Sequence, residues 1–442
     1  MSGARIRGRV IIDGAHGEGG GQILRTALSL SAITGRPLRI ERIRAARRNP
    51  GLAAQHLTAL RAAAAICSAQ LSGDTLGSTC VEFAPEGPVV AGNYVFDVSL
   101  ARAGGSAGAV MLVLQTVLLP LAFAGGDSGV ELLGGTHMAW SPPFDYVRDV
   151  WLPVLAQLGI EAFVELINWG WYPVGKGEVR ARIRGLGGHR ATLKPLELED
   201  RGPLLRVFGR AVAANLPAHI PQRMADRGRT LLAELGADLH IEPLRVRAAC
   251  PGAGLFLTAE YANLNCGFSA IGAVGKPSEQ VAEEAAGTLL KHHASGAALD
   301  RHLGDQILLP LCFSSGPSRF SVEEITAHLE TSAWVIERFG VARVMSERGP
   351  SGMLRSHRRG RQLTMLVAQS DQPGFDPDES DRLALVLSKV DAEACGRRRD
   401  HRQRLRVRLR PERPQLPQED VGGDRADAVE SEQTQFKIVR VA

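Results

Sequence analysis

Two clusters near the start of the chain combine residue types that suit an anionic ligand. The first is the glycine run Gly17–Gln22, which Glu18 interrupts. Glycines ahead of a helix let the backbone approach a ligand closely and leave N–H groups facing an anion. The second cluster holds Arg44, Arg47 and Arg48 just before a predicted helix, and guanidinium groups bind phosphate oxygens in pairs. Both clusters favour a phosphate site, while a tightly packed turn and a solvated charge run would use the same residues.

Other familiar site motifs are missing from the sequence. It contains no G-x-x-x-x-G-K-[ST] phosphate loop, and the glycine run does not match a dinucleotide-binding fingerprint. The 6 cysteines form no C-x-x-C pair and have no regular spacing, which argues against a zinc site or a disulfide framework. We expect most of them to be buried apolar residues.

Histidine offers a nitrogen nucleophile near pH 7, in its neutral form. Of the 12 histidines, those near segments that recur along the chain are His16, His56, His137, His302 and His328. His328 falls early in a predicted helix, at the place that Gln55 or His56 and Tyr146 take in the corresponding helices of the other two units. From spacing alone, a helix-surface or core role fits His328 better than a catalytic one.

The recurring segments form a three-fold repeat. An apolar helical run begins at each of Gln22, Gln115 and Gln306, and a glycine-containing turn and an alternating strand follow each run. A second amphipathic helix comes next, predicted over residues 50–67, 143–158 and 325–339. Units of this kind cannot bury their own apolar faces and must pack against their copies. The wider gap before Gln306 indicates an insertion ahead of the third unit.

Composition and charge allow a large core. The chain has 442 residues, of which 44% are hydrophobic and only 5% aromatic, so small and aliphatic residues must fill most of that core. A net charge of +5 is compatible with an anionic partner without requiring one. The sequence has no apolar stretch of membrane-spanning length and no N-terminal signal core, so we expect a cytoplasmic protein without a membrane segment.

Strand and helix signals divide the chain into four parts. Residues 1–184 hold two repeat units, and residues 185–275 carry separate strand and helix signals, as a small inserted α/β domain would. The third unit, with the helix of His328, is expected over residues 276–349. From 350 to 442 the sequence is rich in arginine and interrupted by proline, which favours a poorly ordered basic tail. This tail fits two interpretations. It could be a basic arm that holds RNA, or a non-native end produced by an altered reading frame.

A series of motifs resembles the RNA 3'-terminal phosphate cyclases. The motifs are His16–Arg25, Ile43–Leu57, Leu114–Pro120, Gly134–Thr136, Trp171–Gly177 and His302–Pro310. The match runs in order from the start of the chain to about residue 348, and several motifs are long enough to be specific. The resemblance implies an α/β (α+β) fold, in which three repeated βαβαββ-type units form a large domain with a smaller inserted α/β domain. This agrees with the repeat and the insertion.

The resemblance also implies an activity, the ATP-dependent conversion of an RNA 3'-terminal phosphate to a 2',3'-cyclic phosphodiester. By position, His328 matches the family's nucleophile, which would carry AMP before AMP passes to the RNA. The family's nucleotide-binding residues match Gln115, His302, Leu303, Gly304, Asp305 and Gln306. The residues expected to line the path of the substrate phosphate are Glu18, Arg25, Arg44 and Arg47. A divalent cation, expected to be Mg²⁺, would offset phosphoryl charge, and Glu18 or Asp305 could hold it or instead cap a helix.

Three other interpretations stay open at this point. A catalytically inactive, RNA-binding or ribosomal-RNA-processing scaffold would share the fold but lack the nucleophile and the nucleotide contacts, which this chain keeps. An enolpyruvyl-transferase-like protein would use similar repeated units without forming a covalent adenylate. A chain with an altered C-terminus could bind RNA without turnover. The physiological RNA, the oligomeric state and the metal ligands do not follow from the sequence.

Overall fold

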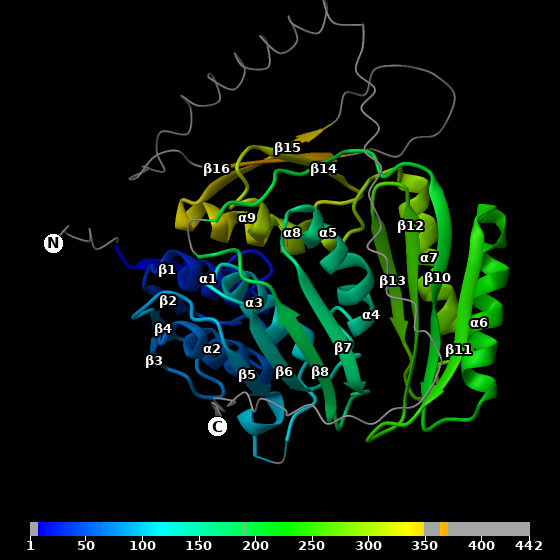
Figure 1. Cartoon of the computed structure of the whole chain (residues 1–442). Coiled ribbons are helices and arrows are strands. Elements are labelled where there is room, and N and C mark those ends of the chain that lie inside the picture. Colours follow the sequence, from blue (N-terminus) through cyan, green and yellow to red (C-terminus); the bar gives the residue numbers. More distant parts are fainter. Residues whose placement is uncertain (1–7, 104, 189–190, 349–362, 370–442) are drawn as a thin grey trace, which may run out of the picture. The chain divides into compact units, whose positions relative to one another are not determined.

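Three four-stranded sheets have the same strand order and directions (Figure 1). In each sheet the first two strands pair in parallel, the fourth strand pairs antiparallel with the second, and the third strand pairs antiparallel with the fourth. The first sheet contains β1 (Val10–Asp13), β2 (Leu38–Glu41), β3 (Gln70–Ser72) and β4 (Val81–Ala84). The second contains β5 (Asn93–Asp97), β6 (Ser128–Gly134), β7 (Ala162–Asn168) and β8 (Gly177–Ile183), and the third contains β9 (Glu197–Leu198), β14 (Ser318–Val322), β15 (Ala342–Arg348) and β16 (Leu363–Gln369). The mixed α/β fold class is confirmed, and the shared topology is the repeat seen in the sequence.

The computed structural model describes residues 8–103, 105–188, 191–348 and 363–369. Apart from β16, the tail predicted for residues 350–442 lies outside these described residues. β16 pairs antiparallel with both β14 and β15. The third sheet therefore extends past residue 349, where the third unit was expected to end.

Two helical segments accompany each sheet. The first sheet has α1 (Gly21–Thr34) and α2 (Ala54–Cys67), and the third has α8 (Leu303–Leu311) and α9 (Ala327–Phe339). In the second sheet, α3 (Val110–Ala122) is followed by α4 (Phe144–Tyr146), which continues through a π-helical turn, η2 (Val147–Trp151), into α5 (Leu152–Gln157). Short 3-10 turns are η1 (Val98–Ala101) and η3 (Ala233–Leu235). α1 packs against α2, α3 and α9, so the units bury their apolar faces on one another, as the repeat requires.

A fourth sheet is inserted into the third unit. Its strands are β10 (Leu204–Ala214), β11 (Asp238–Val246), β12 (Gly252–Tyr261) and β13 (Asn265–Ile271), in the order β11-β10-β12-β13. Helices α6 (His219–Leu232) and α7 (Ser278–Ser295) pack against each other, α6 on β10 and β11 and α7 on β12 and β13 (Figure 1). Because β9 precedes this sheet and pairs with β14, the insertion interrupts the third unit after its first strand.

The edges of the inserted part differ from the expected range of 185–275. β9 lies inside that range but belongs to the third core sheet, and α7 lies beyond it but packs on the inserted sheet. A two-residue strand is too short to show a periodic pattern. The apolar face of α7, with Val281 and Ala285 buried, shows that the helix packs on something but not on which sheet.

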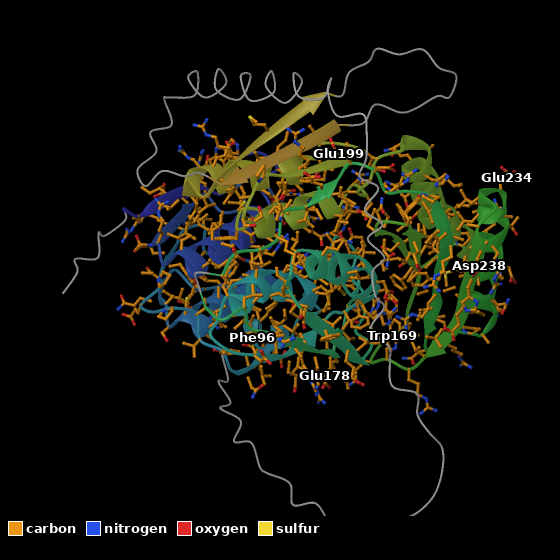
Figure 2. The ribbon with its side chains drawn as sticks, turned by 45° about the horizontal axis from the view of Figure 1, so that its top comes forward. Phe96, Trp169, Glu178, Glu199, Glu234 and Asp238 are labelled. Carbon is orange, nitrogen blue, oxygen red and sulfur yellow. The ribbon has the colours of Figure 1, made fainter. Side chains whose placement is uncertain are left out.

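A buried network connects the second unit to the inserted sheet. His137 Nε2 lies 2.9 Å from Asp145 Oδ2, and Arg210 of β10 donates from Nε to Asp145 Oδ1 at 3.0 Å. Although burial acts to raise the pKa of Asp145, His137 and Arg210 outweigh it and lower that pKa to about 2. Trp169, labelled in Figure 2, stacks on His137 with ring centroids 4.4 Å apart. The Gly134–Thr136 motif therefore leads directly into a structural junction.

Two expectations about composition can be compared with the described residues. No helix among them combines the length and apolarity needed to cross a membrane. Cys67, Cys250, Cys266 and Cys312 are buried, as expected, and Cys80 is partly exposed.

Candidate active site

The glycine loop lies against the first half of α9. The Glu18 N–H donates to Thr331 Oγ1 at 3.3 Å. Gly17 has a φ of 56°, and a Cβ at that residue would lie only 2.4 Å from Thr331 Oγ1. Glycine therefore permits a close approach that carries Glu18 to the end of α9 where His328 lies.

Glu18 contacts two of the predicted site residues. His328 Nε2 lies 3.4 Å from Glu18 Oε2, and Arg47 Nη2 donates to the same oxygen at 2.8 Å. A Cβ at Gly20 would lie 1.7 Å from Glu18 Oε1, so glycine lets the carboxylate fold back over the loop. The predicted nucleophile thus lies beside a carboxylate that also binds the arginine cluster.

His328 occupies the first turn of α9. Thr326 caps the helix by accepting a hydrogen bond from the Leu329 N–H at 3.2 Å. The side chain of His328 is 47% exposed, so a ligand can reach it. Partial burial lowers the pKa of His328 below its ordinary value, Glu18 opposes this shift, and Arg25 adds to it. A neutral imidazole with an accessible nitrogen is the form that a nucleophile needs.

Arg25 of α1 and Asp305 of α8 carry opposite charges near Glu18. Burial lowers the pKa of Arg25 to about 10, although Asp305 and Glu18 act to raise it. Burial likewise raises the pKa of Asp305 to about 7, against the effect of Arg25. Arg25 also donates to Gln22 Oε1 at 2.5 Å. Ionisable groups perturbed together in a cleft are typical of functional sites.

The glutamines of the three repeats meet in one pocket. Gln22, Gln115 and Gln306 all line it, and Gln115 Nε2 donates to Gln306 Oε1 at 2.8 Å. Gln22 also donates to Ser332 Oγ of α9 at 3.1 Å. Arg25, Asp305 and the apolar side chains of Leu118, Leu119, Trp151, Leu155, Leu309 and Pro310 complete most of the lining. The pocket lies where α1, α3 and α8 come together, and Gln115 is the α3 residue that stays partly exposed.

The other predicted residues at the start of α8 have different surroundings. Leu303 is buried in the hydrophobic core, and a Cβ at Gly304 would lie 3.0 Å from Val322 Cγ1 of β14. Loss of water around the ring lowers the pKa of His302, against the opposing effect of Asp300. Asp305 and Gln306 therefore face the pocket, whereas Leu303 is a core residue.

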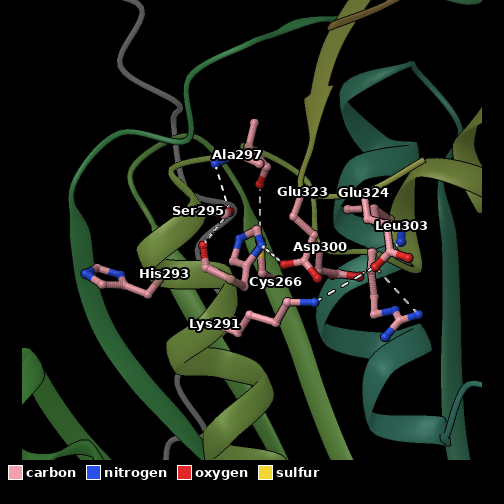
Figure 3. Close-up of polar contacts among 12 residues, drawn as sticks. Cys266, Lys291, His293, Ser295, Ala297, Asp300, Leu303, Glu323 and Glu324 are labelled. Atoms are coloured by element: carbon pink, nitrogen blue, oxygen red, sulfur yellow. Dashed lines mark hydrogen bonds and ion pairs between the residues drawn. The ribbon is translucent and has the colours of Figure 1, made fainter. Parts of the chain in front are cut away.

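Asp300 anchors the start of α8 (Figure 3). Its carboxylate accepts hydrogen bonds from the backbone N–H groups of His302 and Leu303 at 2.9 and 3.0 Å. It also accepts from the Tyr146 hydroxyl at 2.9 Å and from the Gly267 N–H of β13 at 3.2 Å. This buried residue joins the second unit, the inserted sheet and α8. Only its position just before a predicted helix could have marked it in the sequence.

The arginine cluster forms a turn ahead of α2. Arg44 has a φ of 53° and donates to the Gly51 carbonyl oxygen at 2.8 Å. α2 begins after this turn, at Ala54, and not at Pro50 as the sequence predicted. Arg44 is positioned by backbone contacts, whereas Arg47 reaches Glu18.

Gln22 and Trp151 are among the pocket residues that the predicted contacts did not include. The glutamine repeat could have identified Gln22, because it is the counterpart of Gln115 and Gln306. No pattern marked Trp151, whose buried indole N–H has no hydrogen-bond partner among the described residues. Within the described ranges, no three His, Cys, Asp or Glu side chains gather closely enough to hold a metal ion by themselves.

Comparisons with known proteins point to one family. Residues 16–345 match the family described as RNA 3'-terminal phosphate cyclase. The curated RNA 3'-terminal phosphate cyclase of Methylococcus capsulatus is 60% identical over 349 residues, which cover 78% of this chain and 96% of that protein. The protein of the same name from Trichormus variabilis is 56% identical over 75% of this chain and 94% of its own length. The protein of the same name from Salmonella typhimurium is 43% identical over 78% of this chain and 97% of its own length.

Proposed function

Since the chain belongs to the RNA 3'-terminal phosphate cyclase family, we propose that it uses ATP to convert an RNA 3'-terminal phosphate to a 2',3'-cyclic phosphodiester. One observation carries this proposal: an accessible His328 with a lowered pKa lies beside Glu18, near Arg25 and Arg47. His328 could attack a phosphorus atom, and Arg25 and Arg47 could offset the charge that develops on the phosphoryl oxygens.

In the first proposed step the His328 imidazole attacks the α-phosphorus of ATP. A P–N bond forms, the bond to the bridging oxygen breaks, and pyrophosphate leaves with the bonding electrons. The lowered pKa of His328 supports this step, because the nitrogen lone pair is then available at neutral pH. Arg25 and Arg47 would offset the charge of the departing phosphates.

The second and third steps transfer and release AMP. An oxygen of the RNA 3'-phosphate attacks the histidine-linked AMP, which frees His328 and leaves an activated anhydride on the RNA. The neighbouring 2'-hydroxyl then attacks the 3'-phosphorus, loses its proton and expels AMP. This ring closure is favoured because both groups belong to one nucleotide and react at high effective molarity.

The proposed nucleotide site combines the glutamine pocket with the start of α8. Gln115 and Gln306 offer amide groups, and the apolar part of the lining, including Trp151, suits a nucleobase. His302 precedes α8 and would lie at the edge of this site, with Leu303 and Gly304 positioning the helix backbone.

Mg²⁺ is the proposed metal. It is usually bound through one or two carboxylates, with phosphates and water as the other ligands. Glu18 and Asp305 fit this requirement, since both lie close enough to Arg25 to alter its pKa. When bound, the ion would neutralise charge on the phosphates.

The test is the incubation of the purified protein with α-labelled ATP and Mg²⁺. We expect label that is labile to acid and stable to alkali on the wild type and on His219→Ala, which changes an exposed histidine on α6. We expect none on His328→Ala. An unlabelled but folded wild type would favour the inactive scaffold, and it would also fit an enolpyruvyl-transferase-like activity.

A further inference from the structure

His56 lies beneath the glycine loop and has a fixed tautomer. It is the third residue of α2 and is only 5% exposed. The Ala53 N–H donates to His56 Nδ1 at 3.2 Å, so Nδ1 is an acceptor and the proton of a neutral ring must lie on Nε2. In the part of the chain that the structure describes, no group accepts a hydrogen bond from that Nε2–H.

The free nitrogen of His56 points at the start of α1. A Cβ at Gly21 would lie 2.4 Å from His56 Nε2 and 3.0 Å from Arg25 Nη1, so both donors approach the Gly21 backbone closely. Gly20, the residue before α1, gives the helix no side-chain cap. A helix N-terminus, a guanidinium group and an imidazole N–H therefore converge on one point.

The ring stays uncharged in this position. Burial lowers the pKa of His56 to about 3, and Arg25 and Arg44 add to the shift. A neutral imidazole can donate to an anion without changing its charge between pH 5 and 8, whereas an imidazolium would be repelled by both arginines.

We propose that His56 Nε2 donates a hydrogen bond to a phosphate oxygen bound at the N-terminus of α1 beside Arg25. The inference rests on the proposed function, and it adds a neutral donor that the predicted site residues did not include. The phosphate could belong to the triphosphate of ATP or to the RNA 3'-terminus, since both present the same oxygens.

Two variants separate the donor from the helix cap. In His56→Asn the side-chain oxygen can take the place of Nδ1 and accept from Ala53, but nothing reaches the position of Nε2. In His56→Gln the amide nitrogen can take the place of Nε2, but the bond from Ala53 is lost. We therefore expect Asn to keep the thermal midpoint and lose the phosphate contact, and Gln to do the reverse.

Two reaction steps distinguish the source of the phosphate. The first assay measures formation of the enzyme adenylate from labelled ATP, and the second measures transfer of AMP from isolated enzyme adenylate to an RNA 3'-phosphate. We expect His56→Asn to slow one of them on the order of 10²-fold, as loss of a preorganised donor does, and His56→Gln to retain most of the rate. Loss in the first assay assigns the triphosphate, and loss in the second assigns the RNA.

A binding measurement distinguishes failure of the His56 proposal from failure of the proposed function. Calorimetric titration with inorganic pyrophosphate, and with inorganic phosphate, reads the site without turnover, so it applies even if the wild type forms no adenylate. Weaker binding by His56→Asn than by His56→Gln supports the donor. Wild-type behaviour of His56→Asn in both reaction steps and in binding overturns it. A folded His56→Gln variant that is as impaired in reaction and binding as His56→Asn also overturns it. If His56→Asn fails to fold, impaired reaction and binding of His56→Gln by itself overturn the proposal.

Discussion

At the residue scale, the site holds charged groups with too little water around them. Burial is the largest cause of each shift: it lowers the pKa of Arg25 and His328 and raises that of Asp305. Each charged form is therefore less stable than it would be in water. A bound phosphate would stabilise the charged forms of Arg25 and His328, and a bound cation would stabilise that of Asp305, because each supplies an opposite charge.

Asp305→Asn should change the pH dependence of stability. The pKa of Asp305 is raised from 3.8 to about 7, so between these values the folded chain holds a proton that the unfolded chain has lost. Stability from this group is full below about pH 4 and is lost as the pH rises through 7. Asparagine cannot ionise, so the variant should gain stability over the wild type at pH 8 and show little difference at pH 4.

Urea unfolding at the two pH values measures this effect. Asp238→Asn, at an exposed position of β11, is the control for the same substitution outside the site. The explanation is wrong if Asp305→Asn follows the wild type at both pH values. A gain in stability accompanied by loss of adenylation would show that the carboxylate is kept for function.

At the element scale, the path of the glycine loop is set by its contacts with α9. His16 stacks on Trp334 with ring centroids 3.9 Å apart, and Thr331 accepts from the Glu18 N–H. These contacts join the first unit to the third beside the helix end that carries His328. His328, the proposed nucleophile, and its neighbouring carboxylate come from different units, and their alignment depends on this packing.

Gly20→Ala should reduce adenylation more than it reduces stability. The new Cβ would lie 1.7 Å from Glu18 Oε1 and 3.0 Å from Arg47 Nη2, so the carboxylate must move away. A displacement of about 1 Å in a catalytic site can lower the rate on the order of 10²-fold. Gly125→Ala is the matched control, because a Cβ there meets nothing within 4 Å. Equal adenylation rates for the two variants would contradict a positioning role for the loop.

At the scale of the whole molecule, buried carboxylates connect the inserted sheet to the core. Asp145 binds Arg210 of β10, and Asp300 binds the Gly267 N–H of β13 as well as the start of α8. Both carboxylates are nearly inaccessible to water, with 5% and 1% exposure. Such groups are costly when a partner is removed, because the remaining charge stays buried.

Arg210→Ala should therefore lower the free energy of unfolding by about 3 kcal/mol, as loss of one partner of a buried ion pair does. Arg206→Ala is the control on the same strand. The Arg206 side chain, which forms an ion pair with Glu260, is 52% exposed. This pair should therefore contribute less than about 1 kcal/mol to stability. Urea unfolding measures both variants, and similar losses for the two would show that the Asp145 contact is not a stabilising junction.

The sequence by itself determined the repeat, most of the helices and the residues of the arginine and glycine clusters. These features follow from local rules: apolar spacing marks the helix faces, and glycine and proline mark the turns. The positions of α1 and α9 agree with the predicted segments for this reason, whereas α3 begins at Val110, ahead of its predicted start at Gln115. The glutamine repeat also indicated that Gln22, Gln115 and Gln306 are equivalent.

Only the tertiary structure decided what these residues do together. That the glutamines share a pocket, that Glu18 reaches His328, and that His56 faces Gly21 are contacts between units far apart in the chain. The assignment of β9 and α7 to their sheets was also undetermined, since a short strand and an amphipathic helix show that they must pair or pack but not with which partner. Burial, and with it the pKa shifts of the site, depends on that packing.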